Sequence, residues 1–292
     1  MRKNKILFVV IALVMAFSGM AQEFSFGFRA GISFSKFLGD SEMNDAGESL
    51  EQYNFASGFH IGLAANLSLT DRFGFRTELL FSQMGTEYQY EGESYYFLAR
   101  NQTDEKLVFG KRTLDQNVSK ATLEVPLIAY YKLGFVEISG GVYGAVQMSA
   151  TGGGSLNMSE VRSAAGNNVA DFDVTLQHNY NKDVAGQASF RNEPLEIDGS
   201  TLLYSRTTGA YYDYDFKDKN LYQTFDFGLA AGLAFYLNDG LYISGRMTYG
   251  LMDVDLNEYD ISYHKLDSNN EYIQRADKNT NLTIQASVGF LF

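Results

Sequence analysis

The chain contains no cysteine and no tryptophan, and only 2 of its 292 residues are proline. The absence of cysteine excludes disulfides, thiol catalysis and the lipidated cysteine that anchors bacterial lipoproteins. Beyond the N-terminus, no apolar run approaches the roughly 20 residues of a membrane-spanning helix. The net charge is −12 and no basic stripe is present. We therefore expect no nucleic-acid partner, because binding phosphates requires clustered positive charge.

Sequence motifs of the common enzyme classes are also missing. The chain has no HExxH zinc motif, no GxSxG nucleophile turn and no phosphate-binding loop. His178 and His264 lie in predicted loops without a serine or cysteine constellation that would suggest a triad. We therefore expect a protein that is not an enzyme and that has no cofactor and no metal site. An enzyme that assembles its site from distant strands is the alternative.

The N-terminus has the pattern of a secretory signal peptide. Three basic residues lie within the first five positions, Ile6–Phe17 is apolar, and Gly19-Met20-Ala21 supplies the small residues of a cleavage site. This pattern predicts a signal peptide over residues 1–21 and an exported mature chain. A retained N-terminal anchor is the alternative.

The main pattern in the rest of the chain is alternation with a period of two residues. In Phe225–Leu237 every odd position is apolar, whereas the even positions up to Ala234 are Asp226, glycine or alanine. The turn Asn238-Asp239-Gly240 follows, and alternation resumes over Leu241–Leu251. Such alternation predicts strands. A charged, glycine-rich face opposite a continuous apolar face is typical of a strand between lipid and a narrow polar lumen.

The same alternation predicts six further strands. They are Phe24–Phe37, Phe55–Leu69, Phe73–Tyr90, Ala121–Leu133, Phe135–Met148 and Asn281–Phe292. Pro126 lies within one of them and cannot donate to the ladder, so we expect a bulge or weak pairing there. Long connections alternate with short turns, and the predicted long loops are Leu38–Asn54, Glu91–Lys120, Ser149–Leu221 and Asn257–Thr280.

Eight long strands with alternating short and long connections predict an all-β fold. We expect an eight-stranded antiparallel up-and-down transmembrane β-barrel with long extracellular loops, formed by residues 22–292 as one domain with a long loop insertion at 149–221. A soluble lipocalin-like barrel would show the same alternation, with the apolar set inside. The signal peptide, the aromatic terminal residue Phe292 and the rhythm of connections favour an integral protein of the bacterial outer membrane.

Charged residues on the predicted inward face form a candidate site. They are Arg29, His60, Arg76, Glu78, Glu124, Glu137, Asp226 and Arg246. We expect these side chains to form ion pairs that hold the interior together, because a desolvated charge needs a partner. A path for protons or ions through them is the alternative. His60 is expected to be a hydrogen-bonded residue that plugs the lumen rather than a metal ligand.

Two predicted loops carry further candidates. Asp40, Glu42, Asn44 and Glu51 follow calcium-loop spacing, but position 6 is Asp45 instead of glycine, so a solvated acidic loop is the preferred interpretation. The second loop ends in a segment rich in tyrosine and aspartate: Tyr211, Tyr212, Asp213, Tyr214 and Asp215. These residues, like the third-strand tyrosines Tyr88, Tyr90, Tyr95 and Tyr96, could form an aromatic girdle with a strand extension, or a binding face.

Several segments resemble a known family. TELLFSQMG (Thr77–Gly85) and LEVPL (Leu123–Leu127) are similar to motifs of the PorT-like outer-membrane β-barrel family of Bacteroidota. Phe81 replaces a tyrosine that is usual in the family, and Thr122 replaces the tyrosine before Leu-Glu. The resemblance implies an eight-stranded barrel in the outer membrane. One member of the family takes part in type IX protein secretion, and most have no assigned role.

These patterns together lead to one preferred function and one alternative. The preferred function is a binding or scaffold component, with its loops as the interaction surface and a role that could relate to secretion. The alternative is a narrow pore or a receptor for a small molecule or cation. The expected partners are outer-membrane lipid and lipopolysaccharide, and a protein bound through the extracellular loops.

Overall fold

The structure is a computed structural model that describes residues 23–100, 102–183, 192–214, 219–256, 259–275 and 277–292. The predicted signal peptide, residues 1–21, lies outside the described residues. Within the described part, no helix is both long enough and apolar enough to span a membrane.

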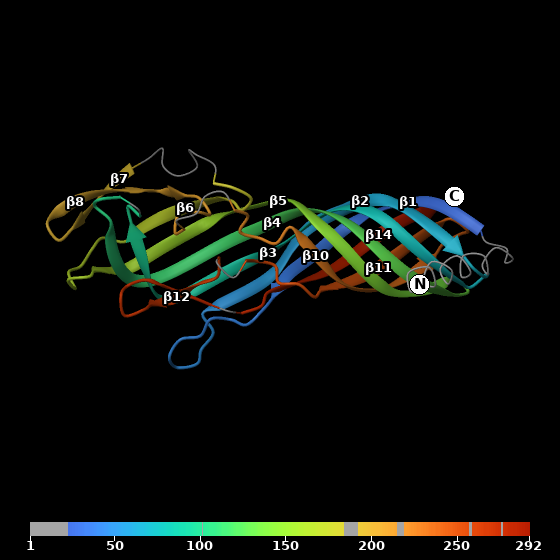
Figure 1. The fold of residues 1–292 in the computed structure, drawn as a ribbon, viewed down its shortest axis with the longest axis horizontal. Helices are drawn as coiled ribbons and strands as arrows, with labels where there is room; N and C mark the ends of the chain where they lie inside the picture. Colours follow the sequence, from blue (N-terminus) through green and yellow to red (C-terminus); the bar gives the residue numbers. More distant parts are fainter. Residues whose placement is uncertain (1–22, 101, 184–191, 215–218, 257–258, 276) are drawn as a thin grey trace, which may run out of the picture.

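Eight antiparallel strands close into a ring (Figure 1). In order around the ring they are β1 (Glu23–Leu38), β2 (Glu51–Ser68), β3 (Phe73–Leu98), β4 (Lys106–Leu133), β5 (Val136–Ser163), β10 (Phe225–Tyr236), β11 (Leu241–Gly250) and β14 (Thr280–Leu291). The last strand, β14, pairs with the first, β1, and so closes the ring. β5 pairs with β10 although the long insertion separates these two strands in the sequence. Because the ring is closed, no strand edge exposes unpaired backbone N–H and C=O groups to lipid, which offers them no hydrogen-bond partner. The eight-stranded barrel predicted from the sequence is confirmed.

The outer face of the ring is apolar and the inner face is polar. Phe28, Leu63 and Leu127 all point outward, with exposed fractions of 52%, 66% and 59%. Their inward neighbours Arg29 and Glu124 are only 2% exposed. This arrangement is the inverse of a soluble barrel and shows that the apolar set faces lipid.

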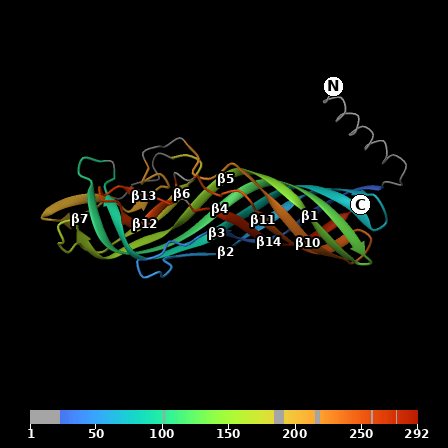
Figure 2. The ribbon, with the colours of Figure 1, turned by 60° about the horizontal axis from the view of Figure 1, so that its bottom comes forward.

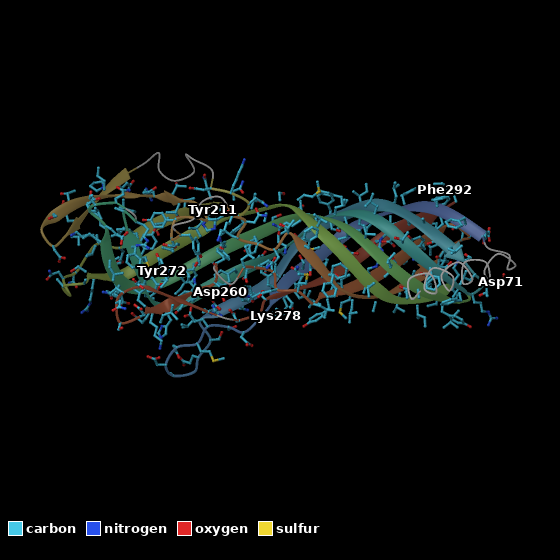
Figure 3. All side chains as sticks on the ribbon, in the orientation of Figure 1. Asp71, Tyr211, Asp260, Tyr272, Lys278 and Phe292 are labelled. Carbon is cyan, nitrogen blue, oxygen red and sulfur yellow. The ribbon has the colours of Figure 1, made fainter. Side chains whose placement is uncertain are left out.

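Short turns and long connections lie at opposite ends of the molecule. Asp71, in the turn between β2 and β3, lies at the same end as the C-terminal Phe292, whereas Tyr211 and Tyr272 lie toward the other end (Figure 3). In outer-membrane barrels the short turns are periplasmic and the long connections extracellular. The elongated end with Tyr211 and Tyr272 is therefore the extracellular one.

The sheet continues far beyond the membrane, and here the predicted loops were wrong. The predicted loop Glu91–Lys120 is mostly strand, because β3 runs to Leu98 and β4 starts at Lys106, with continuous pairing between them. The predicted insertion Ser149–Leu221 begins with the second half of β5, from Ser149 to Ser163. It also contains β6 (Phe172–Asn179), β7 (Asn192–Ile197), β8 (Ser200–Ser205) and β9 (Thr207–Thr208). We call this extracellular part, residues 39–50, 86–100, 102–118, 150–183, 192–214 and 259–275, the extension.

A change in polarity explains why these strand segments read as loops. Along β4, even-numbered residues point inward from end to end, but their character changes near Ala121. On the periplasmic side of Ala121, Leu123 and Leu127 face outward. On the extracellular side, the outward residues from Lys111 to Ser119 are polar, such as Asp115, and Leu114 points inward and is buried. Farther along the strand, Phe109 is an outward apolar residue with an exposed fraction of 41%. Outside the membrane, the strand thus follows the soluble rule, with apolar residues inside.

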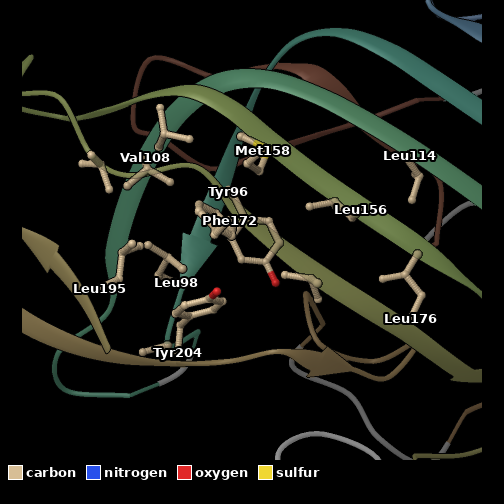
Figure 4. Close-up of a cluster of buried hydrophobic side chains, with 14 of the residues drawn as sticks. Tyr96, Leu98, Val108, Leu114, Leu156, Met158, Phe172, Leu176, Leu195 and Tyr204 are labelled. Atoms are coloured by element: carbon tan, nitrogen blue, oxygen red, sulfur yellow. The ribbon is translucent and has the colours of Figure 1, made fainter. Parts of the chain in front are cut away.

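The extension has its own apolar core (Figure 4). The Phe172 ring contacts Tyr96 edge to face and Tyr204 at a tilt, with centroids 5.5 Å and 5.3 Å apart. A second hairpin, β12 (Ile261–Leu266) with β13 (Tyr272–Gln274), lies in the predicted loop Asn257–Thr280. Figure 2 shows this hairpin at the same end of the molecule as β6 and β7. The predicted long loops therefore form a packed structure above the barrel.

The region around Pro126 pairs weakly with β3, as expected. Thr77 pairs with Leu127 and Leu80 with Glu124, but the two residue pairs between them are absent from the ladder. The register is unchanged across this gap, and on its other side Pro126 pairs with Tyr143. A missing N–H weakens the ladder locally without forming a bulge at the proline.

Candidate functional site

The centre of the lumen holds a carboxylate shared by two guanidinium groups. Glu78, on β3, accepts two hydrogen bonds of 2.7 Å from Arg246, on β11. The same carboxylate accepts bonds of 3.2 and 3.3 Å from Arg29, on β1. All three side chains are at least 94% buried. Strands from opposite parts of the sequence are thus tied together through the interior.

A second ion pair lies nearer the periplasmic end. Arg76 donates to both oxygens of Glu137, at 2.9 and 3.0 Å. The Tyr236 hydroxyl donates to Glu137 and accepts from Arg76. The Arg76 guanidinium also lies over the rings of Tyr130 and Tyr242, with centroid distances of 5.2 and 5.5 Å. The ion pair thus compensates both buried charges, and the two ring faces stabilise the Arg76 guanidinium further.

His60 takes part in the lumen network as a hydrogen-bonding residue. One ring nitrogen lies 2.9 Å from the Ser33 hydroxyl, and the other lies 2.7 Å from the Ser287 hydroxyl. Ser287 also accepts a hydrogen bond from Arg29. Both ring nitrogens are therefore occupied by hydroxyl groups, and none of the described histidines, aspartates or glutamates forms a group of three that could hold a metal ion.

The remaining two predicted lumen residues are not in salt bridges. Glu124 is 2% exposed, and its Oε1 has no hydrogen-bond partner in the described part of the chain. Asp226 accepts hydrogen bonds from the Tyr143 hydroxyl and the Asn281 amide, at 3.0 and 2.9 Å. Six of the eight predicted lumen residues are therefore connected to one another. Arg29, Glu78, Arg246 and His60 form one network, and Arg76 and Glu137 form a separate ion pair. Glu124 and Asp226 belong to neither.

Other members of the lumen network were not singled out from the sequence. Tyr130, Tyr236 and Tyr242 surround Arg76, and Gln285 and Ser287 contact Arg29. Their inward parity is visible in the alternation pattern, which could have identified them. Eight strands enclose an interior just wide enough for side chains, so these ion pairs and rings fill the lumen cross-section.

The tyrosine and aspartate segment lies inside the extension rather than on its outside. Tyr211 is 1% exposed and its hydroxyl donates to the carbonyls of Tyr180 and Lys219. The Tyr212 ring stacks on Tyr96 with centroids 5.8 Å apart. The Tyr214 hydroxyl donates to the Tyr259 carbonyl.

This placement corrects the predicted outer girdle. The rings of these tyrosines pack the inside of the extension, because outside lipid the apolar parts of a sheet turn inward. Asp213 accepts a hydrogen bond from Tyr272 at 2.7 Å, and Asp215 lies outside the described residues. Tyr88, Tyr90, Tyr95 and Tyr96 are buried in the same region. A ligand contact by this segment stays a prediction.

The predicted acidic loop is partly engaged in structure. The Glu42 carboxylate accepts hydrogen bonds from the backbone N–H groups of Tyr263 and His264. Glu51 is 6% exposed and forms a salt bridge of 2.8 Å with Arg275. Asn44 bonds Glu48. The residues with calcium-like spacing are thus used to tie the loop to the β12–β13 region.

Comparisons with known proteins agree with this geometry. Residues 20–256 match the family described as "Outer membrane protein beta-barrel domain". None of the curated proteins compared with the chain matches it. Similar solved structures include Neisserial surface protein A, with 10% identity, a TM-score of 0.37, and coverage of 92% of this chain and 99% of that chain.

Two further solved structures are similar at the same level. Ail, the attachment invasion locus protein of Yersinia pestis, has 12% identity and a TM-score of 0.33, and covers 92% of this chain and 99% of that one. OprG from Pseudomonas aeruginosa has 10% identity and a TM-score of 0.37, and covers 94% and 98%. All three TM-scores lie below 0.5, so these likenesses carry no argument about function.

Proposed function

Because this chain belongs to the outer membrane protein beta-barrel domain family, we propose that it is a non-enzymatic binding or scaffold component of the cell surface. It is an integral outer-membrane protein with an apolar band that faces lipid. In this proposal the barrel is the anchor, and the extension meets a protein partner outside the cell.

The observation that carries this proposal is the length of three strands. β4 and β5 each contain 28 residues and β3 contains 26. A transmembrane strand needs only about 9–11 residues, so more than half of each strand lies outside the hydrocarbon. A strand of 28 residues extends about 90 Å at roughly 3.3 Å per residue. An anchor alone would not need a second packed core beyond its membrane-spanning part.

The filled lumen supports binding over conduction. Ion pairs among Arg29, Glu78 and Arg246 cross the interior, and Arg76 with Glu137 fills the level below. An ion that passed would have to break these pairs in a water-poor space. We therefore expect no resolved channel steps for the purified protein in a planar lipid bilayer. Frequent steps that vanish on substituting Arg76 or Glu78 would favour a narrow pore instead.

Exposed apolar side chains in the extracellular part give the proposed partner surface. Met43 lies in the loop between β1 and β2, and Leu203 lies on β8, with exposed fractions of 58% and 55%. Both lie outside the eight barrel strands. Each is a single exposed apolar side chain, and such positions are accessible probes of a protein contact. The PorT-like resemblance suggests that the partner belongs to an assembly, such as a secretion apparatus.

Crosslinking in intact outer membranes tests the proposal. We expect one protein to co-purify in near-equal amount with the wild-type chain. The paired substitutions Met43→Asp and Leu203→Asp should abolish its recovery without affecting the barrel, because both side chains are exposed. Thr201→Asp, an exposed polar position on the same hairpin as Leu203, is the matched control. Recovery of only lipid and lipopolysaccharide with the wild-type chain would contradict the proposal.

A further inference from the structure

Above the lumen, the extracellular part encloses a small cavity of about 60 Å³. Its walls come from the upper parts of four barrel strands, through Phe37, Tyr53, Tyr88 and Val118, and from the connection between β11 and β14. Asp260, which lines the cavity, marks this region in Figure 3. A space of this size holds a few water molecules or one small polar head group.

Six of the 14 residues in the cavity wall are aromatic. Tyr53, Tyr88, Tyr222, Tyr259 and Tyr263 all line the cavity. The faces of such rings carry partial negative charge and attract cations. Tyr222 already has this contact outside the cavity, because the Lys120 ammonium lies 5.8 Å from its centroid. The wall therefore favours a positively charged occupant and disfavours an anion.

One carboxyl group in the cavity wall lacks a donor for one of its oxygens. Asp255 is 8% exposed, and its Oδ1 has no hydrogen-bond donor in the described part of the chain. A buried acceptor without a donor costs free energy. Asp260, whose side chain is 14% exposed, shares a hydrogen bond with the Asp277 carboxyl. Asp255 lines the cavity, so a donor placed there can reach it.

The charge in the cavity wall is negative. Glu51, Asp255 and Asp260 line it, and no lysine or arginine does so among the described residues. Arg275 binds Glu51 and Asp277 at 2.8 Å and lies 3.8 Å from Asp260. The Lys120 ammonium interacts with Asp255 electrostatically from outside the wall, but Asp255 has no salt bridge within the described residues. A cation in the cavity would give Asp255 a direct partner.

The acid strength of Asp255 reflects the missing partner. Burial, reinforced by the charges of Asp253 and Asp277, raises the pKa of Asp255 to about 7. Burial also raises the pKa of Asp260 above its ordinary value, and a hydrogen bond with Asp277 adds to the effect. A cation in the cavity would stabilise the ionised form of both groups.

We propose that this cavity binds the primary ammonium group of a small organic amine. The ammonium carries three N–H donors, of which Asp255 Oδ1 accepts one, while the tyrosine rings and the neighbouring Asp260 carboxyl face its positive charge. A metal ion fits less well, because none of the described acidic or histidine side chains forms a ligand group of three. This inference does not depend on the protein partner proposed above, and either can fail alone.

Calorimetric titration of the purified, detergent-folded chain with n-butylammonium chloride tests the site at pH 8.5. At this pH the amine is cationic and Asp255 is largely ionised, and n-butanol provides a neutral probe of the same size. We expect saturable one-to-one binding of the amine and none of the alcohol. Asp255→Asn, which keeps the shape of the side chain, should weaken amine binding at least tenfold.

Asp171→Asn is the matched control, because it removes the same charge from an exposed position in the extracellular part. It should bind the amine like the wild type. Phe substituted for Tyr259 keeps the ring and should also retain binding, whereas Tyr259→Leu should weaken it. The proposal is overturned if the wild type does not bind the amine, if butanol binds equally well, or if Asp255→Asn binds like Asp171→Asn. Retained heat-dependent gel mobility confirms that each variant is folded.

Discussion

Oε1 of Glu78 and Nη2 of Arg246 lie 2.7 Å apart across the lumen, although 168 residues separate them in the sequence. Glu78 is inward-facing on β3 and Arg246 on β11, which are not neighbours in the ring. The pair therefore connects non-adjacent walls of the barrel. Arg29 adds a third wall by binding the same carboxylate from β1.

Removing this carboxylate is expected to destabilise the barrel. Glu78→Ala leaves two buried guanidinium groups without their main partner, a change that costs about 3–5 kcal/mol for a buried pair. We expect Glu78→Ala to unfold in detergent at a lower urea concentration than the wild type, as measured by gel mobility. The control Glu87→Ala, at an exposed position of the same strand, should have the same urea midpoint as the wild type. Equal midpoints for the two variants would show that the lumen pairs are dispensable.

The position of the polarity change on β4 is testable with one pair of substitutions. Leu127 and Asp115 both point outward on this strand, Leu127 within the lipid-facing band and Asp115 above it. Leu127→Arg should destabilise the folded barrel in lipid by roughly 2–4 kcal/mol if it lies near the bilayer midplane. Asp115→Arg should have little effect on folding into liposomes. Similar folding yields for both would contradict the membrane boundary drawn at Ala121.

The acidic cavity is expected to make the extension less stable as pH rises. The pKa of Asp255 is raised to about 7 by burial and by Asp253 and Asp277, against about 3.9 in the unfolded chain. The folded state then binds more protons between these values, so this contribution is fully present below about pH 4 and lost as pH rises through 7. Asp260 shifts in the same direction.

Asp255→Asn should remove most of this dependence. We expect the variant to have greater hydrogen-exchange protection than the wild type in segment 251–263 at pH 8.5, after correction for intrinsic exchange rates, and similar protection at pH 5. Asp253, Asp277, Lys120 and Asn279 also face the group and are unchanged in the variant. Identical pH profiles would mean that Asp255 is ionised normally in the folded chain.

His178 is expected to act in the opposite direction. Burial lowers its pKa to about 4, and the ring lies 2.6 Å from the Gln116 amide nitrogen. Because the unfolded group titrates near 6.5, the folded state binds fewer protons between pH 6.5 and 4, and stability falls as pH is lowered through this window. His178→Gln should flatten the loss of protection in β6 between pH 6.5 and 4.5. A steeper loss in the variant would contradict this account.

The barrel could be predicted from the sequence because a lipid-facing strand has a strict rule. In Phe225–Leu237 and Leu241–Leu251 every outer position is apolar except Gly245, and β10 and β11 lie within those bounds. The extension could not be predicted in the same way. Beyond Ala121 the outward residues of β4 from Lys111 to Ser119 are polar, the inward face of β3 contains tyrosines, and the pattern expected for a membrane strand no longer applies.

The lumen site was predictable in part. Parity along each strand places Arg29, Glu78 and Arg246 inward, and all three are buried there. Parity cannot identify which acid meets which base, because that depends on the stagger of the closed ring. For this reason Glu124 has no ion-pair partner within the described residues although it shares the face, and Glu78 has two.

Site-specific photo-crosslinking in living cells tests the central claim most directly. A photoreactive amino acid would replace Leu203 in one strain, Met43 in a second and the lipid-facing Leu127 in a third. We predict a single discrete protein adduct from the two extracellular positions and only lipid adducts from Leu127. If Leu203 and Met43 give no protein adduct while the chain is folded and abundant, the extension is not a partner-binding platform.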